Sequence, residues 1–253
     1  MRNKFWKWPW TSSRGRKNAW GLAPDDDGWF LVGLGRDPSQ SLSVHTAQHL
    51  AAPLAQPGFR DLPQVMQQAG LNRGFSHRPW HARPRVCVGL AANQLLSGVL
   101  DLPVALAESE WQSEVQIEAS RALGLEPEDI SFDFQTIGST DGLVIRLHWV
   151  ACGLSLVTQL NQCVREVGGQ LSSVEPAHEA ASRAAHFLRG GLASVLTQSV
   201  QDWQFDASAG PSQGAFDSDR PAWVINEDWL QDALHSPVGP RLIASGLALR
   251  GLH

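Results

Sequence analysis

Three consecutive carboxylates, Asp25, Asp26 and Asp27, are the first residues whose type and spacing suggest chemistry. They lie between two short apolar runs and precede Gly28, and an Asp-Gly pair between such runs is typical of a β-hairpin turn. Carboxylate oxygens are the ligands that Mg²⁺ and Ca²⁺ prefer, but this triplet lacks the alternating ligands of a calcium loop. The sequence therefore predicts a solvated hairpin turn and assigns no metal to it.

Two pairs of histidines have the i, i+4 spacing that places two imidazoles together on a helix, as in some zinc sites. They are His45 with His49 and His77 with His81. The first pair begins in a strand-like run, Pro79 interrupts the second, and neither has the glutamate of a His-Glu-x-x-His zinc protease. We expect exposed or locally hydrogen-bonded histidines and no metal site. A metal-dependent hydrolase that uses these histidines or the acidic triplet stays a rival interpretation.

Motifs for nucleophilic catalysis or phosphate binding are missing from the sequence. No Gly-x-Ser-x-Gly elbow occurs, and Cys87, Cys152 and Cys163 lie widely spaced in apolar surroundings that favour buried free thiols. No Gly-x-x-x-x-Gly-Lys-Ser/Thr loop occurs, and no lysine follows Lys17. We therefore expect no catalytic residues, no ATP or Mg²⁺ as cofactor, and no enzymatic activity.

Charge separates a basic tail from an acidic body. All three lysines lie within residues 1–18, whereas all 25 acidic residues follow them, so we expect no nucleic-acid partner for the body. In the tail, Phe5, Trp6, Trp8 and Trp10 alternate with lysine and proline, a combination that suits a membrane interface. Both a loose terminus and a membrane-surface anchor are open interpretations of this tail.

The expected location is the cytoplasm. No apolar run approaches the roughly 20 residues of a membrane-spanning helix, and no continuous apolar segment of a signal peptide follows Met1. The odd number of cysteines also suits a reducing compartment.

Apolar periodicity predicts an α/β protein. We expect strands at 19–23, 29–34, 41–46, 85–90, 95–102, 130–134, 143–150 and 171–174, and helices at 63–69, 108–123, 155–167 and 177–188. The helix at 108–123 is the best marked, because Gly124 supplies a left-handed cap and Pro127 prevents continuation. Residues 201–220 are expected to form a loop, whereas 222–230 and 242–249 are expected to be ordered.

The order of these elements resembles the PilM family of type IV pilus assembly proteins. The matching runs are Asp101-Leu102-Pro103, Glu128-Asp129-Ile130-Ser131-Phe132-Asp133-Phe134, Trp149-Val150-Ala151-Cys152, Gly168-Gly169-Gln170-Leu171-Ser172-Ser173-Val174-Glu175-Pro176 and Gly246-Leu247-Ala248-Leu249-Arg250. The resemblance implies an actin-like, ribonuclease H-like mixed sheet with helices, its second half reduced or missing. The expected division is a tail at 1–18, a PilM-like half at 19–191, and a loop-rich segment at 192–253 that returns to the main body.

The resemblance also implies a nucleotide site, from which this sequence departs. In that fold a strand–turn–strand near the N-terminus cradles phosphates through backbone N–H groups. In the corresponding hairpin Pro24 removes a donor, and three carboxylates would repel a triphosphate unless a cation bridged them. No second glycine-rich phosphate loop follows Gly191. An active actin-like ATPase of pilus or type II secretion assembly is the alternative function.

The function that the resemblance implies is a non-catalytic scaffold at the inner face of the bacterial inner membrane. PilM proteins hold the cytoplasmic tail of the inner-membrane protein PilN, so we expect a PilN-like partner. An extended peptide in a groove or on a strand edge suits this role, and strand position alone selects Val88, Leu102, Phe132 and Phe134 as candidate groove residues. The cytoplasmic half of a GspL-like secretion protein is a further rival, although that family usually continues into a membrane span.

Overall fold

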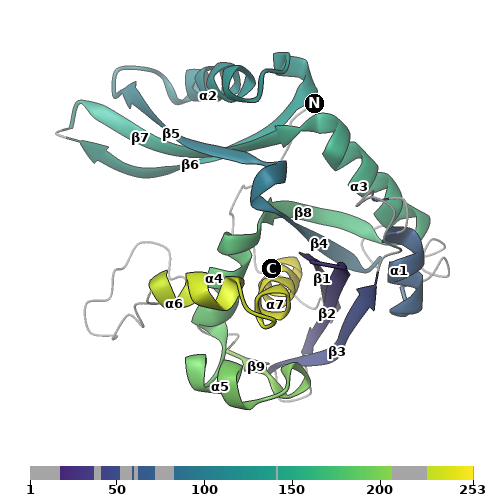
Figure 1. Cartoon of the computed structure of the whole chain (residues 1–253). Coiled ribbons are helices and arrows are strands. Elements are labelled where there is room, and N and C mark those ends of the chain that lie inside the picture. The colour runs from purple at the N-terminus through teal and green to yellow at the C-terminus, as the bar shows by residue number, and fades with distance from the viewer. Residues whose placement is uncertain are drawn as a thin grey trace. The chain divides into compact units, whose positions relative to one another are not determined.

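The computed structural model describes residues 18–36, 41–51, 59, 62–71, 83–140, 142–206 and 227–252. Their contacts divide them into two compact units (Figure 1). The smaller unit is Leu90–Gln162, and the larger unit combines the described parts of Thr11–Gly89 and Cys163–His253. The smaller unit is thus inserted into the sequence of the larger one, an arrangement that the sequence analysis did not foresee. The predicted boundaries at residues 18 and 191 stay predictions.

A mixed six-stranded sheet forms the framework of the larger unit, in the order β8-β4-β1-β2-β3-β9. Its strands are β1 Asn18–Asp25, β2 Gly28–Arg36, β3 Leu42–Ala51, β4 Arg85–Leu90, β8 Gln170–Pro176 and β9 Gln204–Phe205. Strands β1, β2 and β3 form an antiparallel meander, whereas β1 and β4 run parallel. Parallel neighbours need a crossover connection, and α1 (Leu62–Gln68) lies in the segment that links β3 to β4.

Strands β1 and β2 are buried because their sequences are almost continuously apolar. Leu22, Leu31 and Leu34 have no exposed surface, as is typical of strands that are covered on both faces. Pro24 is tolerated in β1 because the ladder with β4 ends at Leu22, so no hydrogen bond to β4 is lost. The antiparallel pairing of β1 with β2 confirms the predicted hairpin.

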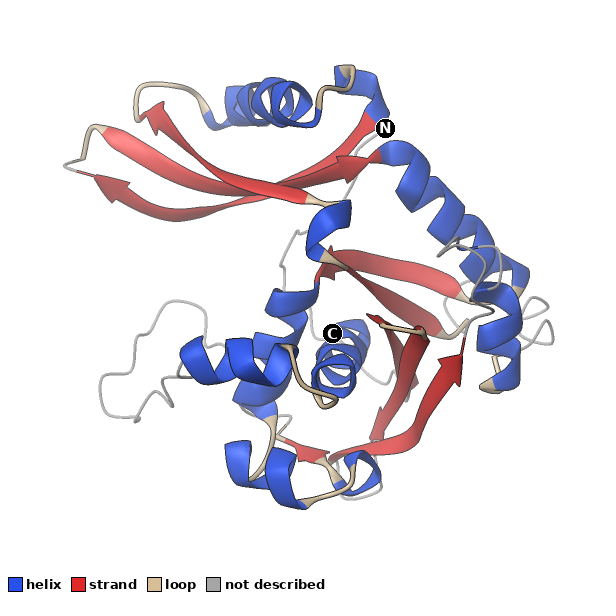
Figure 2. Ribbon diagram, viewed as in Figure 1, coloured by secondary structure: helices blue, strands red, loops and turns tan. Residues whose placement is uncertain are grey.

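Helix α7, Gly239–Leu252, is the element around which the larger unit packs. Eleven of its 14 residues are buried, and a helix that is apolar on all sides must be covered on all sides. It contacts β1, β2 and α4 (Ala177–Phe187), and it lies between the sheet and α4 (Figure 2). The expected return of residues 242–249 to the main body thus takes the form of a helix.

Two glycines allow α7 to approach its neighbours closely. A Cβ atom on Gly21 of β1 would collide with the backbone of Ala244 and Ala248, and one on Gly246 would overlap the backbone of Ala180 in α4. Backbone atoms cannot move aside as the end of a flexible side chain can. Both positions therefore require glycine for steric reasons.

A buried ion pair joins α4 to β8 and α7. Arg183 donates hydrogen bonds to both carboxylate oxygens of Glu175 at 2.7 Å and to the carbonyl oxygen of Gly246 at 3.0 Å. The two side chains are only 10% and 5% exposed. Two parallel charge-assisted bonds compensate the cost of burying both charges, whereas removal of one partner would leave the other charge unpaired.

The smaller unit is a three-stranded antiparallel sheet with one helix packed on it. Strands β5 Leu96–Pro103, β7 Val144–Gly153 and β6 Ile130–Thr140 pair in the order β5-β7-β6. Helix α2, Glu108–Leu123, buries Val115 and Ala119 against the sheet. Gly124 ends α2 in the left-handed conformation, with φ of 64°, so the predicted bounds and cap of this helix are confirmed.

The remaining described elements are short or connect the units in sequence. They are α3 Leu154–Glu166, α5 Gly191–Thr197, α6 Glu227–Leu234 and the 3₁₀ turns Ala92–Gln94, Pro127–Asp129 and Val200–Asp202. None of the helices in the described ranges is long and apolar enough to cross a membrane. The predicted loop at 201–220 is described only as far as residue 206.

Replacement of Gly246 by alanine tests the close packing of α7. In an ordinary helix this change stabilises by up to about 1 kcal/mol. Here the collision with Ala180 should instead lower the free energy of unfolding by about 1–3 kcal/mol or more, measured by urea denaturation. Gly138→Ala is the control, because a Cβ there meets nothing within 4 Å, and its effect should stay within about 0.5 kcal/mol. A neutral Gly246→Ala would contradict the packing.

Replacement of Glu175 by glutamine tests the buried ion pair. The change leaves Arg183 charged, buried and without its anion, so the free energy of unfolding should fall by about 3–5 kcal/mol. Asp206→Asn is the matched control, because the Arg189–Asp206 pair has a bond of 2.6 Å but side chains that are 47% and 45% exposed. Its loss should cost about 1 kcal/mol or less. Equal effects would show that burial adds nothing to the Glu175 pair.

Candidate functional site

The turn between β1 and β2 carries the three predicted carboxylates. Asp25 pairs with Gly28 across the ladder, so Asp26 and Asp27 form a two-residue loop. An Asp-Gly pair at the centre of the turn would place the loop at Asp27 and Gly28, but the observed loop lies one residue earlier. Aspartate tolerates the backbone conformations of such turns. The backbone N–H of Asp26 donates to Oδ1 of Asp25 at 2.9 Å. This bond fixes the Asp25 carboxylate and leaves its second oxygen free to face another group.

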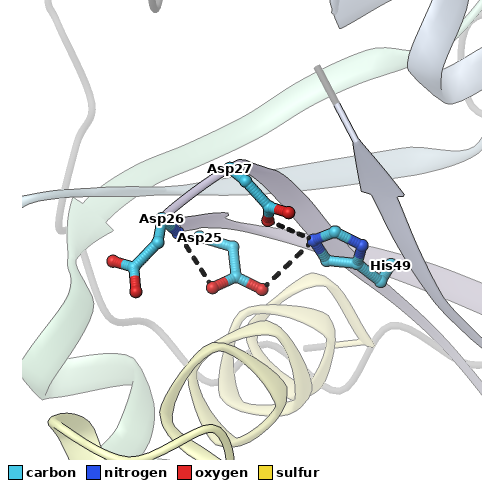
Figure 3. Close-up of polar contacts among 4 residues, drawn as sticks. All are labelled: Asp25, Asp26, Asp27 and His49. Atoms are coloured by element: carbon cyan, nitrogen blue, oxygen red, sulfur yellow. Dashed lines mark hydrogen bonds and ion pairs between the residues drawn. The ribbon is translucent and has the colours of Figure 1, made fainter. Parts of the chain in front are cut away.

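Strand β3 brings His49 to the same turn (Figure 3). Leu50 lies opposite Trp29 in the β2–β3 ladder, so the end of β3 runs beside the turn. Nε2 of His49 is 2.9 Å from Oδ1 of Asp27 and 3.4 Å from Oδ2 of Asp25, whereas the Asp26 carboxylate points away. We call Asp25, Asp27 and His49 the turn cluster.

His45 does not take part in the turn cluster. The β2–β3 register shifts because Gly33 pairs with Thr46 and Leu34 pairs with Val44, which makes His45 the extra residue of a bulge. Its imidazole lies over Gly33 and meets Trp20 edge-on at 5.2 Å between ring centroids. Burial lowers the pKa of His45, although a hydrogen bond with the Leu34 backbone acts in the opposite direction.

The two histidines of this pair therefore have separate partners, since His45 lies 3.1 Å from the Thr46 hydroxyl and His49 contacts Asp27. His77 and His81 lie outside the described residues. The sequence analysis missed the contact of His49 with the acidic turn. The order of three successive predicted strands could have indicated this contact. If β3 pairs antiparallel with β2, the end of β3 lies beside the β1–β2 turn.

The turn offers hydrogen-bond acceptors where a phosphate chain would need donors. Pro24 has no N–H, and the N–H of Asp26 is already bonded to Asp25. The carboxylates would repel a triphosphate unless a cation lay between them. The sequence-based expectation that ATP does not bind stays a prediction, and this arrangement gives it an electrostatic reason.

The four candidate groove residues fall in different units. Val88 has 0% exposure within β4 of the larger unit. Leu102, Phe132 and Phe134 belong to the smaller unit, where Leu102 is buried and both phenylalanines are half-buried against the core beneath α2. Apolar strand residues fill cores before they line grooves, so strand position selected core residues. Phe5, Trp6, Trp8 and Trp10 lie outside the described residues.

The cysteines are buried free thiols, as predicted. Burial raises the pKa of Cys87 and of Cys152 to about 11. Burial, with the nearby Glu166 carboxylate, also raises the pKa of Cys163. Because the thiolate is the reactive form, these groups are poor nucleophiles at neutral pH.

The sequence matches no protein-family model and none of the curated proteins with which it was compared. The solved structures that it matches include the following two. A chain of the PilM–PilN type IV pilus biogenesis complex matches with a TM-score of 0.51 and 15% identity, over 67% of this chain and 53% of that chain. The cytoplasmic domain of EpsL, an inner membrane component of the type II secretion system of Vibrio cholerae, matches with a TM-score of 0.46 and 16% identity, over 68% and 62%.

These likenesses concern the fold. The predicted actin-like, mixed α/β fold class is confirmed by the first match together with the mixed sheet. This chain covers about half the length of the PilM–PilN chain that it matches. Activity and partners do not follow from a likeness at 15% identity.

Thiol reactivity tests the burial of the cysteines. With a pKa of about 11, Cys87 and Cys152 carry a thiolate fraction of only about one in a thousand at pH 8. Native protein should therefore react with a disulfide reagent at least about tenfold more slowly than protein in denaturant, in which all three thiols should react. A thiol that reacts at the denatured rate in folded protein would contradict the described packing.

Proposed function

We propose that this chain is a non-catalytic scaffold of type IV pilus assembly, which binds the cytoplasmic tail of a PilN-like inner-membrane protein from the cytoplasmic side. The observation that carries the proposal is the likeness of its fold to a chain of the PilM–PilN complex. The order of motifs from Asp101 to Pro176, described above, supports the same assignment. At 15% identity the likeness establishes the fold, and the assembly role is our inference.

The smaller unit offers backbone edges on which an extended peptide can bind. β5 and β6 are the outer strands of its sheet, and a strand at a sheet edge carries N–H and C=O groups available for a further strand. Val99 on β5 and Ile137 on β6 are 55% and 49% exposed. A tail that adds to either edge would gain main-chain hydrogen bonds and apolar contacts.

The proposed lack of catalysis rests on the chemistry of the described side chains. The raised pKa values of Cys87 and Cys152 disfavour a thiolate nucleophile. The acidic turn disfavours a phosphate chain. Binding of a partner, by contrast, requires only a shaped surface and therefore fits these residues better.

Two calorimetric titrations of the purified chain test this function. A synthetic peptide of the cytoplasmic tail of a PilN-like inner-membrane protein should bind, and Mg-ATP should give no heat of binding. Binding of Mg-ATP with turnover would support the alternative, an actin-like ATPase. Absence of peptide binding would contradict the scaffold proposal.

Edge variants locate the peptide site. Val99→Lys and Ile137→Lys each place a charge on one outer strand, and the variant on the occupied edge should weaken peptide binding by about tenfold or more. Leu196→Lys is the control, because Leu196 is 71% exposed in the larger unit. Unchanged binding in both edge variants would place the peptide elsewhere.

A further inference from the structure

We propose that the turn cluster binds a divalent transition-metal ion of the Zn²⁺ class. The protein ligands would be one carboxylate oxygen of Asp25, one of Asp27 and Nε2 of His49. This proposal concerns the larger unit alone and does not depend on the assembly role proposed above.

The geometry of the turn cluster suits one shared ion. The three ligand atoms lie within 4.8 Å of one another, and Nε2 of His49 is 2.9 Å and 3.4 Å from the two carboxylate oxygens. Nitrogen and oxygen ligands bind Zn²⁺ at about 2.0–2.2 Å, so two ligands of one ion lie about 3–3.5 Å apart. An ion can therefore enter with only small movements of these side chains.

The type of ligand decides which ion is favoured. A pair of carboxylates by itself suits Mg²⁺ or Ca²⁺, whereas an imidazole nitrogen favours Zn²⁺ and its transition-metal neighbours. Without an ion, Nε2 carries at most one hydrogen and is well placed for only one carboxylate, since the 3.4 Å separation from Asp25 is long for a hydrogen bond. An ion would interact strongly with all three groups at once.

Two separate parts of the fold hold the ligands in place. Asp25 is oriented by the N–H of Asp26, in a turn at the end of the buried strands β1 and β2. His49 is positioned by the β2–β3 ladder, in which it lies opposite Phe30. A bound ion would thus join the hairpin turn to β3, and it would stabilise the folded protein because the unfolded chain does not bring these residues together.

The turn cluster is open to solvent, which determines the kind of site. The side chains of Asp25, His49 and Asp27 are 25%, 39% and 63% exposed. Three protein ligands with solvent access leave a coordination position for water or for a ligand atom from a partner. We therefore expect moderate affinity and easy exchange of the ion.

The test is a titration of the purified chain, stripped of metal by a chelator, with Zn²⁺ by calorimetry and with Co²⁺ by visible absorption. We expect one ion at the turn cluster, a visible Co²⁺ spectrum, and a rise in melting temperature on addition of Zn²⁺. His49→Gln and Asp27→Asn should each weaken binding by about tenfold or more. Asp26→Asn and His45→Gln are matched controls, because one lies in the same turn and the other on the same strand, and both should bind as the parent does.

Each of the other outcomes contradicts the proposal. Equal losses in the Asp26→Asn control would indicate general attraction of cations to acidic residues. Retained binding in His49→Gln and Asp27→Asn would place the ion elsewhere in the chain, and preference for Mg²⁺ or Ca²⁺ over Zn²⁺ would exclude the imidazole as a ligand. Melting curves of all variants in chelator show whether each one is folded, and peptide titration in chelator keeps this result separate from the assembly role.

Discussion

Burial of helix α7 is the constraint on which the larger unit depends. Eleven of its 14 residues are buried, and the helix is covered by β1 and β2 on one side and by α4 on another. This close packing is possible because Gly21 and Gly246 leave room for neighbouring backbone. Arg183 then fixes the arrangement, since it binds both Glu175 and the carbonyl oxygen of Gly246. The strands that hold the acidic turn are thus held in place by a helix more than 200 residues later in the sequence.

The turn cluster depends in turn on the register of β2 and β3. Side chains alternate between the two faces of a strand, so a slip by one residue would direct His49 to the opposite face. The bulge at His45 absorbs one extra residue before His49 is reached. The imidazole of His45, which covers Gly33, occupies space that a larger residue at position 33 would need. The backbone bulge at this position therefore sets the face of β3 on which His49 lies.

Local sequence signals predicted many of the helices and strands, but they did not predict contacts between residues far apart in the sequence. The bounds of α2 followed from its apolar periodicity and from Gly124, and the β1–β2 hairpin followed from a short turn between two apolar runs. The contact between His49 and Asp27 joins residues 22 positions apart and requires the β2–β3 register, which the sequence does not state. Val88 was a poor choice for a groove residue for a related reason. Strand position does not tell which faces other elements cover, and here both faces of β4 at Val88 are buried.

The carboxylates of the turn affect a phosphate chain and a metal ion in opposite ways. Three aspartates in the turn disfavour an anion, and the imidazole of His49 completes a set of ligands that favours a cation. The two effects are linked, because a bound divalent ion would neutralise the charge that opposes a phosphate chain. Only nucleotide affinity measured without metal therefore tests whether the carboxylates repel a phosphate chain. Affinity measured with metal at the turn cluster includes the neutralising effect of the ion.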